Sequence, residues 1–195
     1  AVLGGEGDLS ATEMVDVLQA LPIAAGGILF DQLDKLEQAH DDGKDKNGSK
    51  NHELPKKIVI PDVVDDTVVT GLAEGMFYYN NRVEEIVLPD TVTAIPKAFV
   101  REAHHLTSIK NTEHITSIGN AAFMHSRIRE ALFPNLKTLG QTVFAGCSLL
   151  YVADVGNEIT EVLPRTFELC QKLSLVKGGT KVTSIGMRAF YWTTN

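Results

Sequence analysis

The sequence contains no long apolar run and no surplus of positive charge. Its 195 residues carry 25 acidic and 18 basic side chains, which gives a formal net charge of −7. A transmembrane helix needs roughly 18 or more consecutive apolar residues, and no run in the chain approaches that length. Binding to nucleic acid without sequence preference needs a basic surface. These two absences disfavour membrane insertion and nucleic-acid binding.

The motifs of common enzymes and cofactor sites are missing as well. The chain has no nucleophile elbow, no P-loop and no H-E-x-x-H zinc motif. His104, His105 and His125 fall on loops, but no cysteine or carboxylate completes a tetrahedral set at zinc-site spacing. We therefore predict a noncatalytic protein with no cofactor and no metal.

What the chain does contain is a phenylalanine that returns every 21 to 24 residues. The members of this series are Phe77, Phe99, Phe123, Phe144, Phe167 and Phe190. Branched aliphatic residues stand eight and five positions before the ring, as Ile115 and Ile118 do before Phe123. In the second unit Val92 and Ile95 stand at seven and four, which indicates the loss of one residue. Self-similarity at this period is typical of a solenoid, in which each unit stacks on its neighbours.

A short β-branched run accompanies each unit and ends at proline or a polar residue. These runs are 57–61, 83–89, 106–109, 128–134, a segment within 149–154, and 173–176. Their composition predicts single strands. Proline marks the strand ends because it has no N–H to donate to a neighbouring strand. Stacked in parallel, the strands would close a shared core that the phenylalanine rings fill.

The frame resembles the BspA-like leucine-rich repeats, also called the Treponema-type repeat. The unit of that family runs roughly L-x-x-I-x-L-P-x-x-V-T-x-I-G-x-x-A-F-x-x-C. The chain matches it as VEEIVLPDTVTAIPKAF up to Phe99, as ITSIGNAAF up to Phe123 and as VTSIGMRAF up to Phe190. The resemblance covers about residues 58–190. It implies an α/β repeat solenoid, a stack of about six coils of 21–24 residues with short parallel strands.

Cysteine occurs twice, at Cys147 and Cys170, which is the cysteine position of the family unit. Asn80, Glu102 and Ser126 replace the cysteine in other units. Equivalent positions in neighbouring coils lie near the roughly 5.5 Å between α-carbons that a disulfide requires. Free cysteine, however, is often buried and fills small gaps well. We favour two buried thiols and keep the disulfide as the alternative.

Residues 1–53 lack the repeat. Ser10 and Glu13 have the spacing of a capping box, and apolar residues through Leu21 then lie on one helical face. We expect a helical cap or attachment segment at 1–40, a mobile polar linker at 41–53 and the solenoid at 54–195. The chain stops just after the last phenylalanine, where a solenoid needs a cap. We therefore expect the solenoid to continue beyond Asn195 or to be covered there by another subunit.

The outward strand positions change from charged to apolar along the repeat. At the N-terminal end Lys56 and Lys57 stand opposite Glu84 and Glu85 as cross-strand pairs. Toward the C-terminus we predict a binding surface that comprises Leu132, Tyr151, Val152, Leu175 and Trp192. Apolar side chains that gather on a surface mark interaction sites more often than single exposed ones do.

These observations support two hypotheses about function. The family resemblance implies a protein-binding or adhesion module, displayed outside the cell, that contacts a host surface factor through its strand face. The alternative is a structural component of a virion or surface appendage, such as a tail-fibre, decoration or receptor-binding protein. The helical leader and the uncapped end would suit such an assembly, in which the partner is a neighbouring subunit.

Overall fold

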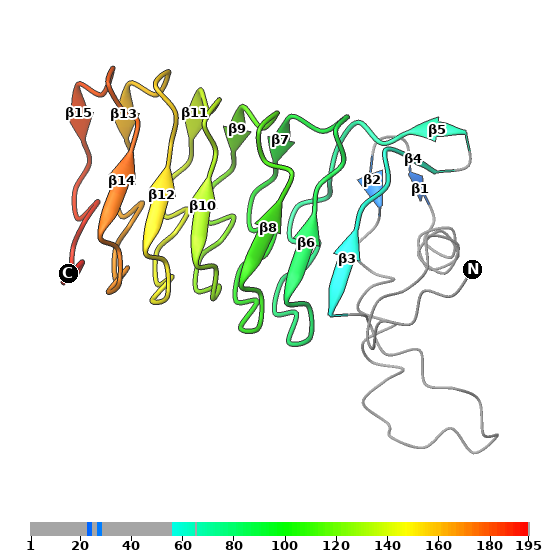
Figure 1. Ribbon diagram of the computed structural model, residues 1–195, viewed down its shortest axis with the longest axis horizontal. Coiled ribbons are helices and arrows are strands. Elements are labelled where there is room, and N and C mark those ends of the chain that lie inside the picture. The colour runs from blue at the N-terminus through cyan, green and yellow to red at the C-terminus, as the bar shows by residue number, and fades with distance from the viewer. Residues whose placement is uncertain (1–22, 25–26, 29–55, 65, 195) are drawn as a thin grey trace, which may run out of the picture.

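The computed structural model describes residues 23–24, 27–28, 56–64 and 66–194. From residue 56 onward the chain winds into a solenoid of stacked coils (Figure 1). β1 (Ile23–Ala24) and β2 (Gly27–Ile28) pair antiparallel, within the segment 1–40 that was predicted to be helical. The remainder of the predicted helical segment 1–40 and the predicted linker 41–53 lie outside the described residues.

One side of the solenoid carries a longer strand from each coil, and we call this side the strand face. β3 (Lys57–Val59), β6 (Glu85–Val87) and β8 (Ser108–Lys110) form one parallel sheet. β10 (Glu130–Leu132), β12 (Val152–Asp154) and β14 (Leu175–Lys177) form a second parallel sheet. The predicted parallel stacking of the short strands is therefore confirmed.

Shorter parallel strands lie on another side of the coils. They are β7 (Ala94–Ile95), β9 (Ser117–Ile118), β11 (Thr138–Leu139), β13 (Glu161–Val162) and β15 (Ser184–Ile185). The first coil has an antiparallel pair instead, β4 (Val63–Val64) with β5 (Thr67–Val68). In β7, β9, β11 and β13 the second residue is buried, because successive side chains in a strand point to opposite faces.

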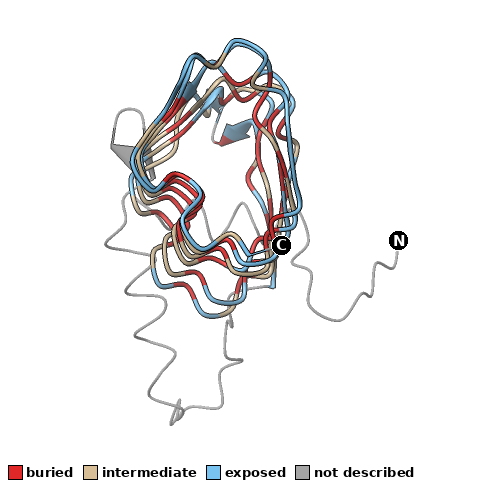
Figure 2. Ribbon diagram, turned by 90° about the vertical axis from the view of Figure 1, so that its left-hand side faces the viewer, coloured by how far each residue is buried: buried red, intermediate tan, exposed pale blue. Residues whose placement is uncertain are grey.

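The residues buried between the coils form one apolar cluster. Figure 2 shows where the buried positions lie along each coil. Phe123 and Phe144 are completely buried, as the repeat predicts. Their rings stack with centroids 5.4 Å apart, and Phe167 continues the column at 5.4 Å from Phe144. Phe190 stacks 5.3 Å from Phe167 but remains partly exposed.

The segment around each phenylalanine is a hydrogen-bonded turn rather than a helix. Around Phe123, Ala121 and His125 adopt left-handed φ angles of 55° and 58°. The N–H groups of 121, 123 and 125 donate to carbonyls of the next coil at 2.9, 3.0 and 2.8 Å. Left-handed residues do not continue a right-handed helix. The helical part of the predicted α/β class is therefore wrong for the residues that the structure describes.

The second coil carries its ring one position out of register. Its left-handed residues are Ala98 and Glu102, which flank Val100 instead of Phe99. The N–H of Val100 donates to the next coil at 2.8 Å in the way that the N–H of Phe123 does. Val100 therefore occupies the anchor position, one residue after Phe99.

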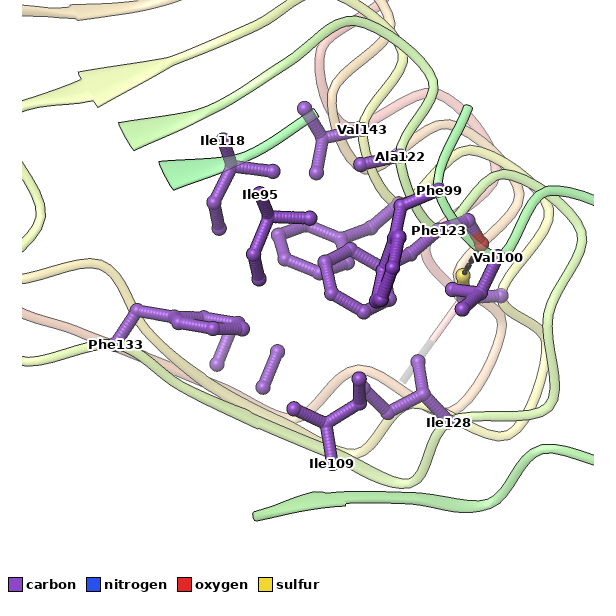
Figure 3. Packing of buried hydrophobic residues seen from close by; sticks show 14 of the residues in the cluster. Ile95, Phe99, Val100, Ile109, Ile118, Ala122, Phe123, Ile128, Phe133 and Val143 are labelled. Carbon is purple, nitrogen blue, oxygen red and sulfur yellow. Dashed lines mark hydrogen bonds between the residues drawn. The ribbon is translucent and has the colours of Figure 1, made fainter. Parts of the chain in front are cut away.

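No residue is missing from the second unit, so that part of the sequence interpretation is wrong. Ile95 stands five positions before Val100, the usual spacing. Phe99 takes the place that Ala122 has in the third coil, and both are completely buried (Figure 3). By the same register Ala103, and not Glu102, stands at the family cysteine position, where it too is completely buried.

Candidate functional site on the strand face

The strand face presents two outward residues per strand, because side chains alternate along a strand. The central residue of each strand points inward, and in five of the six strands it is buried; Val176 of β14 is the exception. The first outward row runs Lys57, Glu85, Ser108, Glu130, Val152 and Leu175. The second runs Val59, Val87, Lys110, Leu132, Asp154 and Lys177. The residue before each strand adds Lys56, Glu84, Thr107, Arg129, Tyr151 and Ser174.

The N-terminal part of this face is charged in the way that the sequence predicts. Lys56 Nζ lies 3.0 Å from the Glu84 carboxylate, and Lys57 Nζ lies 3.6 Å from that of Glu85. All four side chains are substantially exposed, so solvent screens both pairs.

The C-terminal part of the face exposes apolar side chains. Tyr151 and Leu175 are 44% and 48% exposed, and Val152, half-buried, pairs in register with Leu175. Leu132 is also exposed but lies in the other outward row, beside Asp154. The structure therefore places Val152 and Leu175 side by side and Leu132 one row away.

The hydroxyl of Tyr151 contacts the neighbouring strand. It donates a hydrogen bond to the Glu130 carboxylate. This hydrogen bond, which only the protonated hydroxyl can make, raises the pKa of Tyr151 above its ordinary value. The hydrogen bond links the Tyr151 side chain, which remains exposed, to the neighbouring strand.

Trp192 does not lie on the strand face. It adopts a left-handed φ of 60° and occupies the turn position that Leu169 has one coil earlier, where Leu169 N–H donates to the Tyr191 carbonyl. Its ring stacks on that of Tyr191 with centroids 5.9 Å apart and is exposed. The predicted binding residues therefore fall into two places, the strand face and this turn.

Cys147 and Cys170 are free buried thiols, as we favoured from the sequence. Cys147 Sγ donates to the Phe123 carbonyl and Cys170 Sγ to the Phe144 carbonyl, each at 3.0 Å. Burial raises the pKa of Cys147 to about 12 and also raises that of Cys170. Such thiols are poor nucleophiles, since the thiolate is the reactive form.

A cleft of about 390 Å³ interrupts the strand face between β8 and β10. Its lining comprises Thr107, Ser108, Ile109, Lys110, Asn111, Thr112, Glu113, Arg129, Glu130, Leu132 and Tyr151. Sequence reasoning named Leu132 and Tyr151 but missed the break itself. The signal was Asn111, which stands where Leu88, Phe133 and Val155 place buried apolar side chains in other coils.

In the described part of the chain, neither a metal-ligating cluster nor a membrane-spanning helix is found. Within 56–64 and 66–194, no group of three or more His, Cys, Asp and Glu side chains is arranged to hold a metal ion. His104 and His105 are exposed, and His125 is half-buried. The same residues include no helix with the length and hydropathy of a membrane span.

Comparison with known proteins identifies the family whose repeat this chain contains. Residues 70–195 match the model of the BspA type leucine rich repeat region, in six copies. No curated protein matches the chain.

Solved structures share the fold. A leucine rich repeat protein from T. pallidum is 21% identical at a TM-score of 0.56, over 68% of this chain and 75% of that one. A leucine-rich repeat protein from Bacteroides ovatus is 21% identical at a TM-score of 0.50, over 71% of this chain but 47% of its own length. At such identities the likeness concerns the fold.

Proposed function

The chain belongs to the BspA-type leucine-rich repeat family, and from that premise we propose that it is a noncatalytic module that binds a protein partner through its strand face. The observation that carries the proposal is the C-terminal part of that face, where Tyr151, Val152 and Leu175 present apolar surface on neighbouring strands. Aromatic anchors held in a fixed position supply a disproportionate share of interface energy.

Adhesion outside the cell is the more specific form of this proposal. It rests on the family resemblance, which implies surface display and the binding of a host surface factor. The runner-up is a structural role in a virion or surface appendage, in which a neighbouring subunit covers the solenoid. The aromatic pair Tyr191 and Trp192, exposed on a turn away from the strand face, favours keeping this second function.

The test is a paired substitution on the strand face. Tyr151→Ala with Leu175→Ala removes two exposed side chains that contribute little to the core, so the thermal melt should stay close to that of the parent. Binding to a panel of immobilised host-surface proteins, measured by surface plasmon resonance, should weaken by at least about tenfold, because anchors of this kind often contribute 2 kcal/mol or more. The matched control is Lys56→Ala with Lys57→Ala, at the charged end of the same face.

Removal of residues 1–53 separates the two functions. Binding that survives the Tyr151→Ala and Leu175→Ala pair but is lost with the leader would make the leader the attachment segment. The structural role would then replace adhesion, and sedimentation analysis of the full chain should show a self-assembly that the truncated chain lacks.

A further inference from the structure

The strand face is divided at one place, between β8 and β10. The strands on either side belong to two separate parallel sheets, and the division falls at Asn111, the residue that follows β8 (Figure 1). At the equivalent positions Leu88, Phe133 and Val155 donate their N–H groups to the next coil. Asn111 instead adopts a left-handed φ of 61°, and its N–H donates to no residue that the structure describes. The main chain at Asn111 therefore does not continue the pairing that the other coils make.

Side chains make the contacts between the coils at this place. Nδ2 of Asn111 donates to the Leu88 carbonyl at 2.8 Å and to the Asp90 carboxylate at 2.6 Å, both in the coil before. The Thr112 hydroxyl donates to the Leu132 carbonyl, in the coil after. The junction is thus closed beneath, and the outward side chains around it form the walls of the cleft of about 390 Å³.

The lining of the cleft is mostly polar, and its charges cancel. Two lining side chains are aliphatic and one is aromatic, whereas the other eight are polar or charged. A ligand with one net charge gains no overall attraction from such a lining. An apolar ligand would leave the polar groups without partners, which is unfavourable. The charged members are Lys110, Arg129, Glu113 and Glu130.

Four polar side chains of the lining are uncommitted within the described chain. Lys110 and Arg129 can only donate hydrogen bonds, and the Glu113 carboxylate can only accept them. The Ser108 hydroxyl can do both. A ligand that satisfies this set must donate and accept over a short distance. Hydroxyl groups do both, and neighbouring hydroxyls on one ring do so from fixed positions.

Tyr151 brings an aromatic ring to the cleft. Its hydroxyl donates to the carboxylate of Glu130, which also lines the cleft, and the residue remains 44% exposed. The face of an aromatic ring carries partial negative charge. The C–H groups on one face of a sugar ring carry partial positive charge and can pack on Tyr151, while the hydroxyls at the edge of the sugar stay available for hydrogen bonds.

We propose that this cleft binds a neutral sugar unit, a pyranose whose hydroxyls meet the uncommitted side chains and whose C–H face packs on Tyr151. The site goes beyond the proposed function, because it adds a ligand of another chemistry beside the apolar residues Val152 and Leu175. About 390 Å³ lies at the lower end of the range for small-ligand pockets and suits one or two sugar units. The sugar is either a free saccharide or part of a glycan on the protein partner.

The probes are the methyl glycosides of glucose, galactose and mannose, each titrated into the full-length chain labelled with ¹⁵N. Three other molecules are matched controls. Glycerol has neighbouring hydroxyls but no ring, glycine has both charges but no hydroxyl, and methyl glucuronide has the glucose ring with a carboxylate. The amide shifts of Ser108, Lys110 and Glu130, followed to saturation, measure binding in the cleft.

We expect saturable shifts with at least one neutral glycoside, and at least about tenfold weaker binding of all three controls, which corresponds to about 1.4 kcal/mol. Tyr151→Ala should weaken binding of the glycoside by at least about tenfold, whereas Tyr151→Phe keeps the ring and should retain it. Lys177→Gln, in the same outward row as Lys110 but outside the cleft, should leave binding unchanged.

Two results overturn the proposal. One is the absence of saturable shifts with all three glycosides at about 100 mM, a concentration that would reveal even very weak binding. The other is binding of glycerol, glycine or the glucuronide that equals or exceeds binding of the neutral glycosides, since the ring or the neutral charge would then not be what the cleft selects.

Further measurements separate the two sources of the sugar and the two proposals. If Ser108→Ala weakens binding of the intact partner but not of the enzymatically deglycosylated partner, the sugar belongs to a glycan on that partner; if it affects neither, the ligand is a free saccharide. Leu175 does not line the cleft, so Leu175→Ala should weaken partner binding and leave glycoside binding intact. If the partner binds and no glycoside does, only the sugar site fails. If a glycoside binds and no protein in the panel does, only the protein interface fails.

Discussion

The two sheets of the strand face have the same parallel strand pairing but differ in the size of the side chains that point inward. Beneath β3, β6 and β8 lies a row of isoleucines, at positions 58, 86 and 109. Beneath β10, β12 and β14 the same row reads alanine, alanine and valine, at positions 131, 153 and 176. On the outside, the first sheet has cross-strand ion pairs and the second has apolar side chains.

The geometry of the aromatic pairs also differs between the sheet with inward isoleucines and the sheet with inward alanines. Over the isoleucine sheet, Phe77 and Phe99 meet edge to face at an interplanar angle of 81°. Over the alanine sheet the rings of Phe144 and Phe167 stack at 14°, and Phe133 adds a ring 6.5 Å from Phe144. Small residues in one row make room for large ones in another, since protein interiors are filled to a nearly constant density. The repeat thus determines how much side-chain volume fills the interior of a coil, but the large side chains can stand at different positions of the unit.

The largest effect should come from removing a ring in the middle of the stacked column. Phe144→Ala leaves a cavity between two neighbouring rings and should lower the free energy of unfolding by about 3–5 kcal/mol. Phe77→Ala removes a ring with one edge-to-face neighbour. It should cost less by about 0.5–1.5 kcal/mol, the contribution of an aromatic pair beyond its burial. Chemical denaturation of both variants measures the difference, and equal losses would show that stacking adds nothing.

The sequence was sufficient to predict most of the solenoid. Fixed spacing between Phe123, Phe144, Phe167 and Phe190 makes the rings stack in one column, and the strands keep the predicted register. The outward pairs Lys56–Glu84 and Lys57–Glu85 followed from that register. Periodicity predicts such features because each depends only on which residues face inward.

What could not be predicted depends on local backbone geometry. The absence of helix around the rings follows from paired left-handed residues, such as Ala121 and His125, whose side chains do not disclose that conformation. The register of the second unit was predicted wrongly because Phe99 continues the series of phenylalanines. The backbone shows that Val100, one residue later, occupies the anchor position. The cleft depends on one polar residue, Asn111, at an apolar position.

A second test places a large inward side chain from the first sheet at the equivalent position of the second sheet. Ala153→Ile places the residue of the equivalent position Ile86 into the alanine row, where Ala153 is completely buried. The space is already occupied by rings, so we expect a loss of about 1–3 kcal/mol from overpacking. Val176→Ile, on the more exposed neighbouring strand, should change the unfolding free energy by less than about 0.5 kcal/mol. Should Ala153→Ile prove neutral, the two rows would be interchangeable and the volume argument wrong.

The buried thiols lie in the C-terminal half of the solenoid, and they should make the free energy of unfolding depend on pH. The position three residues after the anchor is Ala103 in the second coil but Cys147 and Cys170 in later coils. Because burial raises the pKa of Cys147 from 9.0 to about 12, the folded state holds the proton that the unfolded state releases. Stability is therefore complete below pH 9 and should fall between pH 9 and 12 by about 1.4 kcal/mol per pH unit for this thiol.

The measurement is the free energy of unfolding at several alkaline pH values, in the parent and in Cys147→Ser. Serine already stands at this position in the third coil, as Ser126, so the variant keeps a buried hydroxyl. Between pH 9 and 12 its free energy of unfolding should fall less steeply than that of the parent, by about 1.4 kcal/mol per pH unit. Alkylation under denaturing, non-reducing conditions should label both cysteines, whereas a pair that reacts only after reduction would reveal a disulfide.

The smallest effect concerns the ion pairs of the first sheet. Lys57 and Glu85 lie on neighbouring strands with 41% and 30% of their side chains exposed, so water screens their attraction. A double-mutant cycle with Lys57→Ala and Glu85→Ala should give a coupling energy of about 0.2–1 kcal/mol, and about 1 M salt should remove most of it. The same cycle on Val152→Ala and Leu175→Ala should be insensitive to salt, because apolar contact carries no charge. If both cycles responded alike to salt, the contrast between a charged and an apolar half of the strand face would have no energetic meaning.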